Sequence, residues 1–284
     1  MSTWVWVNGA LSDAGEARVA ALDHGVTVGD GIFETAKVVD GSPFAITRHL
    51  ARLRRSAEVI ALRLPWSDDE LIAACSSTIA AAAADPSNAA AGVGRVRITV
   101  TGGPGPLGSD RSDVPPTLIV AAGPGAPWPP STAVATVTWV RNERSAVAGA
   151  KTTSYAENVV ALAEAHRLGA SEAILTNTVG ALCEGTGSNV FLEVEGHLCT
   201  PALSTGCLAG ITRQLVCELL DVVERDDLTL AHLRSTSEAF LTSSTRDVQP
   251  IDRVDDVALP LVPGPLTAAA QAAFSSLEAE GLDP

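Results

Sequence analysis

Lysine is rare in this chain, and its lysines are the first candidates for chemistry. Of 19 basic side chains, only Lys37 and Lys151 are lysines, and all the others are arginines. Arginine stays protonated in proteins, whereas a lysine amine in a desolvated site can lose its proton and act as a nucleophile. Lys151, in the stretch GAKTTSYAEN, is therefore a candidate nucleophile. On spacing alone, a surface cation explains this position equally well.

A carboxylate and a helix start follow further along the chain. Glu184 stands among small residues in CEGTGSNVF, and small residues cluster again before a helix expected to begin near Ala209. A glycine–threonine start such as GIT, residues 210–212, presents free backbone N–H groups and the positive end of the helix dipole to an anion. An ordinary capped helix explains the same residues, so both interpretations stay open.

Taken together, these groups are the three that pyridoxal 5'-phosphate requires. A lysine amine forms the Schiff base, a carboxylate keeps the pyridine nitrogen protonated so that the ring accepts electrons, and the helix start holds the phosphate. Lys151, Glu184 and residues 210–212 supply one candidate for each role.

The chain resembles the class IV aminotransferases, the fold-type IV enzymes that use pyridoxal 5'-phosphate. This family includes D-amino-acid transaminase, branched-chain aminotransferase and aminodeoxychorismate lyase. The resemblance covers nearly the whole chain, and it rests on GDGIFETAKV, HLARLRRSA, GAKTTSYAEN, EGTGSNVF…TP…GCLAGITR and SSTRDVQPI.

The resemblance implies a role for particular residues at the cofactor. Lys151 is the implied Schiff-base lysine, serving as nucleophile and as general acid and base, and Glu184 is the implied partner of the pyridine nitrogen. The residues implied for the phosphate are Arg52, Ile211, Thr212 and Ser244.

Tyr155 is the only tyrosine of the chain, and its role has two interpretations. We expect it on the same helical face as Lys151, four residues away. Branched-chain relatives carry a tyrosine near this place that contacts the ring hydroxyl, although the spacing here differs by one residue. A packed aromatic side chain is the alternative.

The strand GIFETAKV supplies candidates for the substrate pocket. Phe33, Thr35 and Lys37 alternate along it, so all three project to one side. That side lines the substrate pocket in one interpretation, and in the other Lys37 is only solvated at its edge.

The usual carboxylate clamp of D-amino-acid transaminases is missing. Those enzymes carry an Arg-x-His pair in the loop after the strand that here is RVRITV, whereas this chain has Thr101-Gly102-Gly103 there and no Arg-x-His anywhere. Arg95 and Arg97 alternate on that strand and point to one face. Arg97 lies closer to where relatives place a substrate-binding arginine, and it is our candidate.

Three activities are compatible with this resemblance. We favour transfer of an amino group from a D-amino acid, or from an (R)-amine, to a 2-keto acid. The alternatives are an aminodeoxychorismate lyase that releases pyruvate and 4-aminobenzoate, and a branched-chain aminotransferase. A non-catalytic interaction protein is disfavoured, because the cofactor residues Arg52, Lys151 and Glu184 are all present.

The elements that must position these residues suggest an α+β fold with two α/β domains and the cofactor in the cleft between them. We expect an N-terminal domain over residues 1–120, a Pro/Gly-rich linker over 121–132 and a cofactor-binding domain over 133–284. A hairpin is expected at Asp40-Gly41. The expected helices are 47–61 (capped by Thr47), 68–84, 153–168, 209–223 and 265–280. The other expected strands are WVWVNGAL, 94–101, 116–122, 133–140, 172–176, 188–195 and 238–242.

Bulk properties exclude several classes of protein. A net charge of −14 argues against a nucleic-acid partner. No signal peptide or membrane span is expected, and five cysteines without a CxxC pair indicate neither a disulfide framework nor a zinc site. GPGPLG matches GxGxxG, but no helix follows it, so we expect a loop. These features predict a cytoplasmic enzyme without a metal, and the family resemblance implies a homodimer.

Overall fold

The computed structural model describes residues 1–284, and the chain forms two compact units. Unit 1 comprises Met1–Pro127, Ala150–Tyr155 and Leu282–Pro284, and unit 2 comprises Trp128–Gly149 and Ala156–Gly281. Each unit combines a β-sheet with helices, which confirms the α+β class. The units are not continuous halves of the chain, because the segment that carries Lys151 and the last three residues both belong to unit 1. No helix combines the length and hydropathy that crossing a membrane would require.

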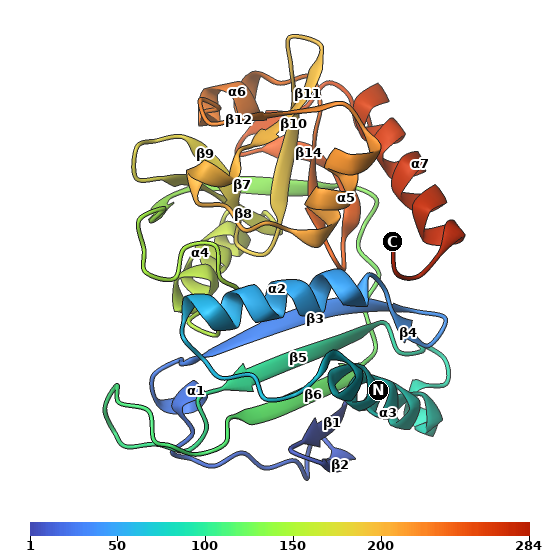
Figure 1. The fold of residues 1–284 in the computed structure, drawn as a ribbon. Helices are drawn as coiled ribbons and strands as arrows, with labels where there is room; N and C mark the ends of the chain where they lie inside the picture. The colour runs from blue at the N-terminus through green and yellow to red at the C-terminus, as the bar shows by residue number, and fades with distance from the viewer. The chain divides into compact units, whose positions relative to one another are not determined.

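Unit 1 contains a six-stranded sheet in which every neighbouring pair is antiparallel, in the order β2-β1-β6-β5-β3-β4 (Figure 1). Its strands are β1 (Trp4–Val7), β2 (Ala10–Asp13), β3 (Gly31–Val39), β4 (Ser42–Pro43), β5 (Arg95–Thr101) and β6 (Thr117–Gly123). The predicted hairpin joins β3 to β4. Asp40 and Gly41 both have positive φ, 49° and 76°, which is the backbone that this two-residue turn requires.

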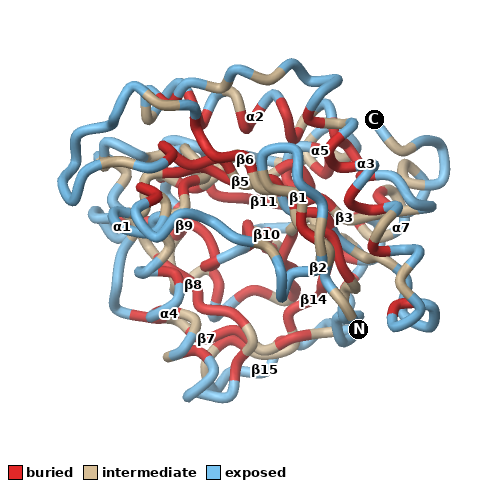
Figure 2. Tube along the Cα trace, turned by 90° about the horizontal axis from the view of Figure 1, so that it is seen from below, coloured by how far each residue is buried: buried red, intermediate tan, exposed pale blue.

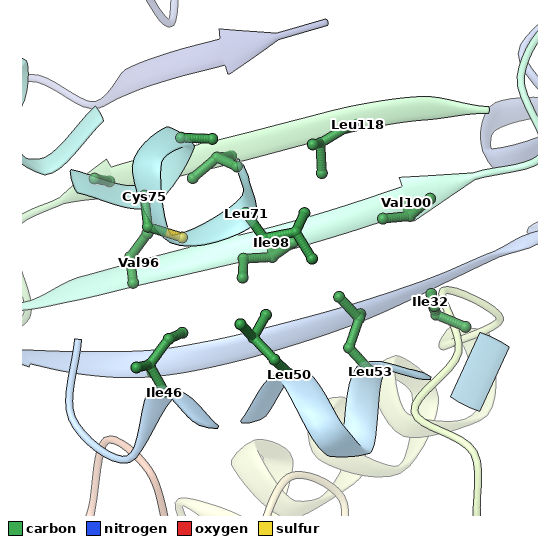
Figure 3. Packing of buried hydrophobic residues seen from close by; sticks show 14 of the residues in the cluster. Ile32, Ile46, Leu50, Leu53, Leu71, Cys75, Val96, Ile98, Val100 and Leu118 are labelled. Atoms are coloured by element: carbon green, nitrogen blue, oxygen red, sulfur yellow. The ribbon is translucent and has the colours of Figure 1, made fainter. Parts of the chain in front are cut away.

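The helices of unit 1 are α1 (His24–Thr27), α2 (Ile46–Val59), α3 (Asp68–Ala84) and the 3₁₀ turn η1 (Pro86–Asn88). α2 and α3 pack on the same face of the sheet, where Leu53 of α2 and Leu71 of α3 meet Ile98 of β5 (Figure 3). Burial is concentrated along the central strands, while the connecting loops are exposed (Figure 2). The opposite face of the sheet carries Phe33 and Arg97.

The start of α2 differs from the prediction. The helix begins at Ile46, its N-cap Ala45 has φ 54°, and no side chain of the helix start caps it. Thr47 does not act as the cap. It is itself bound by Asp283, whose carboxylate accepts hydrogen bonds from Thr47 N (3.0 Å) and Thr47 Oγ1 (2.5 Å). One backbone donor of the first helical turn, Thr47 N, is thus satisfied by the C-terminal tail.

Unit 2 contains a nine-stranded mixed sheet, in the order β12-β11-β10-β13-β14-β7-β8-β9, with β15 paired to β14. Its strands are β7 (Thr132–Arg141), β8 (Glu172–Asn177), β9 (Leu182–Gly185), β10 (Asn189–Val194), β11 (His197–Pro201), β12 (Val222–Arg225), β13 (Ala239–Ser243), β14 (Asp247–Val254) and β15 (Val257–Ala258). β9 also approaches β10, so the sheet curls back on itself. The turn between β9 and β10, within EGTGSN, lies where the two strands approach each other.

The helices of unit 2 are α4 (Ala156–Arg167), α5 (Ile211–Leu219), α6 (Leu230–Ser235), α7 (Pro265–Glu280) and the 3₁₀ turn η2 (Leu203–Thr205). α4 covers β7 and β8 through small residues, with Ala161 and Ala165 packed against Ala173. The small side chains allow the helix to approach the sheet closely.

Several boundaries differ from the sequence predictions. The expected linker 121–132 is shorter, because β6 continues to Gly123 and β7 already begins at Thr132. The helix expected over 153–168 begins only at Ala156, and the helix expected over 209–223 covers Ile211–Leu219. The strands β9, β11, β12, β14 and β15 were not predicted; four of them have five residues or fewer, whereas β14 has eight. The segment WVWVNGAL was expected as one strand but forms the two strands β1 and β2.

Candidate functional site

In unit 1, the segment around Lys151 pairs with β3 through one isolated antiparallel bridge, between Ile32 and Thr152. Phe33 N donates to Lys151 O (3.0 Å), and Thr153 N donates to Gly31 O (2.8 Å). Lys151 N in turn donates to Ser56 Oγ on α2, at 3.0 Å. The backbone on both sides of the lysine is therefore fixed, and the side chain starts from a defined point.

The Lys151 amine lies in an aromatic environment. Its Nζ is 4.4 Å from the centroid of the Phe33 ring and 5.9 Å from that of Tyr155, and the two rings meet edge to face at 5.2 Å. The Arg97 guanidinium carbon lies 3.6 Å from the same Phe33 centroid. The structure thus brings together four predicted site residues, namely Phe33, Arg97, Lys151 and Tyr155. The prediction that Tyr155 shares a helical face with Lys151 is wrong. Both residues precede α4, in a segment that lies beside β3.

Thr35 and Lys37 are placed differently along the same strand. In the β3–β5 register, Thr35 faces Arg97 and Lys37 faces Arg95. The Lys37 amine lies 5.1 Å from the centroid of the Phe44 ring. Lys37 is therefore part of a separate cation–aromatic pair, two positions along the strand from Thr35.

Arg52 is buried on α2 and fixed by a carboxylate. Its Nε and Nη2 donate to the two oxygens of Glu34, both at 2.7 Å, and His49 Nδ1 lies 2.7 Å from Glu34 Oε2. Burial alone would raise the pKa of Glu34, but the charges and hydrogen bonds of Arg52 and His49 lower it to about 2. Glu34 is thus an ionised group, and it holds the guanidinium in one orientation.

In unit 2, the Glu184 carboxylate is held from two sides. Arg141 Nε donates to Glu184 Oε1 and Leu208 N donates to Glu184 Oε2, each at 2.8 Å. Asn158 holds the arginine, since its Oδ1 accepts from Arg141 Nη1 at 2.5 Å. These contacts fix the direction of the two carboxylate oxygens.

The start of α5 has the features of an anion site. Its N-cap is Gly210, no side chain caps the first turn, and Ile211 and Thr212 are buried there. A Cβ on Gly210 would collide with the side chain of Asn189, so only glycine fits this approach. Ser244, half-buried, lies in the turn between β13 and β14. Unit 2 therefore holds Glu184 and three of the residues predicted for the phosphate.

The sequence matches the model of one protein family, described as amino-transferase class IV, over residues 31–254. The chain belongs to the class IV aminotransferases. Several members of this family resemble it over most of their length. A protein of Methanocaldococcus jannaschii that has been assigned as a branched-chain-amino-acid aminotransferase is 32% identical, over 88% of each chain.

Other class IV aminotransferase relatives differ in their activities. The D-alanine aminotransferase of Listeria innocua is 29% identical over 89% of this chain and 88% of its own. The aminodeoxychorismate lyase of Bacillus subtilis is 27% identical over 94% and 92%. Among solved structures, the branched-chain aminotransferase of Thermoproteus uzoniensis with norvaline has a TM-score of 0.87, with 29% identity over 98% of this chain and 95% of that one.

Class IV aminotransferases use pyridoxal 5'-phosphate, which confirms the predicted cofactor. The residues of this chain fit that group. Unit 1 offers a half-buried lysine amine and a buried, oriented arginine, and unit 2 offers an ion-paired carboxylate and a helix start without a capping side chain. Amine, carboxylate and phosphate donors are the groups that this cofactor requires.

The side chains that orient the site residues of this class IV aminotransferase were not predicted from the sequence. Glu34 and His49 orient Arg52, and Arg141 and Asn158 orient Glu184. Glu34 lies inside GIFETAKV, where its alternation with Phe33 places it on the helix-covered face of the sheet. That buried position for a charged residue was a signal that could have identified it.

Proposed function

We propose that this chain is a pyridoxal-phosphate-dependent transaminase that moves an amino group from a D-amino acid to a 2-keto acid. The observation that carries the proposal is the contact of both Arg97 and Lys151 with the ring of Phe33. A guanidinium close to the reacting amine can bind a substrate carboxylate and orient the amino acid toward that amine. The (R)-amines are secondary substrates in this proposal, because they lack the carboxylate.

Each predicted site residue has its own role in this proposal. Lys151 carries the cofactor and moves the proton of the substrate carbon, and Glu184 pairs with the ring nitrogen. The phosphate is held by Arg52, Ile211, Thr212 and Ser244. When bound, the cofactor supplies an electron sink for the transfer.

The partners of these residues define what each can do. Because Glu34 neutralises and orients Arg52, the guanidinium keeps one direction for a phosphate. Arg141 Nε and Leu208 N hold the two oxygens of Glu184, so that the carboxylate keeps a fixed direction for pairing with the ring nitrogen.

A branched-chain aminotransferase is the second candidate, and the relatives favour it. The M. jannaschii protein and the T. uzoniensis enzyme both bear that assignment. The apolar rings of Phe33 and Tyr155 would also suit an aliphatic side chain. A lyase acting on aminodeoxychorismate is the third candidate, as the B. subtilis relative has that activity.

One comparison separates the three candidates. The holoenzyme is mixed with D-alanine, L-leucine or aminodeoxychorismate without any keto acid, and the absorbance of the cofactor and the release of pyruvate are followed. We expect D-alanine to convert the cofactor to its amine form fastest. A faster reaction with L-leucine would establish the branched-chain activity instead, and continuous pyruvate release from aminodeoxychorismate would establish the lyase.

We also propose that the enzyme is a cytoplasmic homodimer, as the family resemblance implies. Light scattering on the purified chain measures the mass directly, and twice the 29.1 kDa of one chain is the expected result.

A further inference from the structure

Glu172 is a buried carboxylate that the proposed chemistry does not use. It is 2% exposed at the start of β8. Its Oε1 accepts from Thr186 N at 3.0 Å, from Thr186 Oγ1 and from Ala173 N at 3.2 Å, and its Oε2 accepts from Ser188 Oγ at 2.9 Å. Arg246 Nη2 lies 3.8 Å from Oε2. Most of these donors belong to one short turn, residues 185–188.

That turn begins immediately after Glu184. Gly185 N donates to Ser188 O at 2.8 Å, which closes the turn. A Cβ on Gly185 would lie 3.0 Å from Cγ and 3.1 Å from Cδ of Glu172, so the glutamate side chain lies directly against the main chain at this point. Glu172 therefore fixes the backbone next to Glu184.

A second route connects the same turn to the Glu184 carboxylate through hydrogen bonds. Thr186 O accepts from Asn158 Nδ2 at 2.8 Å. Asn158 Oδ1 then accepts from Arg141 Nη1 at 2.5 Å, and Arg141 Nε donates to Glu184 Oε1 at 2.8 Å. A shift of Thr186 would move Asn158, and with it the arginine that orients Glu184.

We propose that Glu172 is a positioning residue for the Glu184 carboxylate. It acts on Glu184 along both routes, through the backbone of Gly185 and through Asn158 and Arg141. This inference rests on the proposed function, in which Glu184 pairs with the ring nitrogen of pyridoxal 5'-phosphate. In metal sites, loss of a residue that orients a ligand lowers metal affinity or activity about 10- to 100-fold. Catalytic groups must also be held within about 0.5 Å of their productive geometry, so we expect a loss of the same order here.

Glu238 provides a matched control in the same unit. It is also 2% exposed, and its Oε2 accepts from Thr267 N and Thr267 Oγ1, both at 2.7 Å, while Oε1 accepts from Leu266 N at 3.1 Å. Those donors belong to the start of α7 and not to the EGTGSN turn. Replacing either glutamate with glutamine removes the same charge from a similarly buried site.

The experiment compares Glu172→Gln, Glu238→Gln and Glu184→Gln with the wild type. Each protein is loaded with pyridoxal 5'-phosphate that carries ¹⁵N in the ring. The ¹⁵N chemical shift, the melting temperature and the rate of the half-reaction are measured. We expect Glu172→Gln to move the ¹⁵N shift part of the way toward that of Glu184→Gln and to slow the half-reaction about tenfold. Glu238→Gln should lower the melting temperature but keep the wild-type ¹⁵N shift.

Three outcomes would overturn the inference. A Glu172→Gln enzyme with the wild-type ¹⁵N shift and rate would show that Glu172 only stabilises the fold. If Glu184→Gln changes the ¹⁵N shift in the same experiment, the proposed function still stands. An unchanged ¹⁵N shift in Glu184→Gln itself would remove the proposed role of Glu184, and the inference with it. If Glu172→Gln does not fold, Ser188→Ala removes one donor to Glu172 and must give a smaller shift in the same direction, and no shift at all would reject the proposal.

Discussion

The two lysines of this chain have similar neighbours but different positions. Each amine lies over an aromatic ring, at 4.4 Å from the centroid of Phe33 for Lys151 and at 5.1 Å from that of Phe44 for Lys37. A ring near the amine therefore does not distinguish them. What distinguishes Lys151 is its additional contact with Tyr155 and the presence of Arg97 on the same Phe33 ring.

The first prediction uses this pair. Lys151→Ala should abolish covalent attachment of the cofactor and lower turnover by a factor on the order of 10³ or more, because nucleophile and proton carrier are lost together. Lys37→Ala should retain the attachment. Borohydride reduction of the wild-type holoenzyme followed by peptide mapping identifies the modified lysine, and label on Lys37 would refute the assignment.

The second prediction concerns the substrate carboxylate. Arg97→Ala should raise the KM for D-alanine about 10- to 100-fold, the range expected for one lost hydrogen bond to a charged group. The KM for an (R)-amine without a carboxylate should change little. Arg95→Ala is the matched control, since Arg95 lies two residues away on the same face of β5. Equal effects of Arg97→Ala on both substrates would show that Arg97 does not bind the carboxylate.

At the scale of elements, local signals predicted those parts whose boundaries are set locally. α3 covers Asp68–Ala84 as predicted, because Ser67 and Glu70 form a capping box at its start. α7 covers Pro265–Glu280 as predicted, with Pro265 at its first position, where the missing N–H costs nothing. The hairpin at Asp40-Gly41 follows equally from two adjacent residues.

Elements that depend on distant partners were not predictable in this way. The start of α2 depends on Asp283, which is 236 residues from Thr47. Residues 153–155 were expected in a helix, but hydrogen bonds to β3 and to Gly29 hold Thr153 and Ser154 outside α4. The same limit applies to the site. Lys151 and Glu184 were identified from their residue types, whereas Arg141 meets Glu184 only in the folded sheet, 43 positions apart.

The third prediction tests the distant cap. Asp283→Ala should destabilise unit 1 by about 1 kcal/mol, since it removes the acceptor of two donors at the start of α2. Asp283→Asn keeps one accepting oxygen and should lose less. The midpoint of urea unfolding measures both variants. A wild-type midpoint for Asp283→Ala would show that water replaces the carboxylate at this exposed helix start.

At the scale of the whole molecule, acidic groups outnumber basic ones, and the charge of −14 makes stability depend on pH. Most carboxylates are exposed and contribute little individually. Glu34 differs because it is 1% exposed and paired with both Arg52 and His49. Its protonation would leave the buried guanidinium of Arg52 without its counter-charge, so the core of unit 1 responds to this one carboxyl group.

The last prediction follows from the pKa of Glu34, which is lowered from 4.5 to about 2 although burial alone would raise it. A lowered carboxyl pKa stabilises the folded state above pH 4.5, and this stability is lost as the pH falls from 4.5 toward 2. The full contribution is about 3 kcal/mol, from 1.36 kcal/mol per pKa unit.

The free energy of unfolding, measured with urea at pH 6, 4, 3 and 2, should therefore fall more steeply for the wild type than for Glu34→Gln. The variant is less stable at pH 6 because its amide cannot balance Arg52, but the difference between the two proteins should shrink across this window. Other carboxylates titrate in both proteins and cancel in the comparison. A difference that stays constant from pH 6 to pH 2 would show that Glu34 is not the group that couples acid to the stability of unit 1.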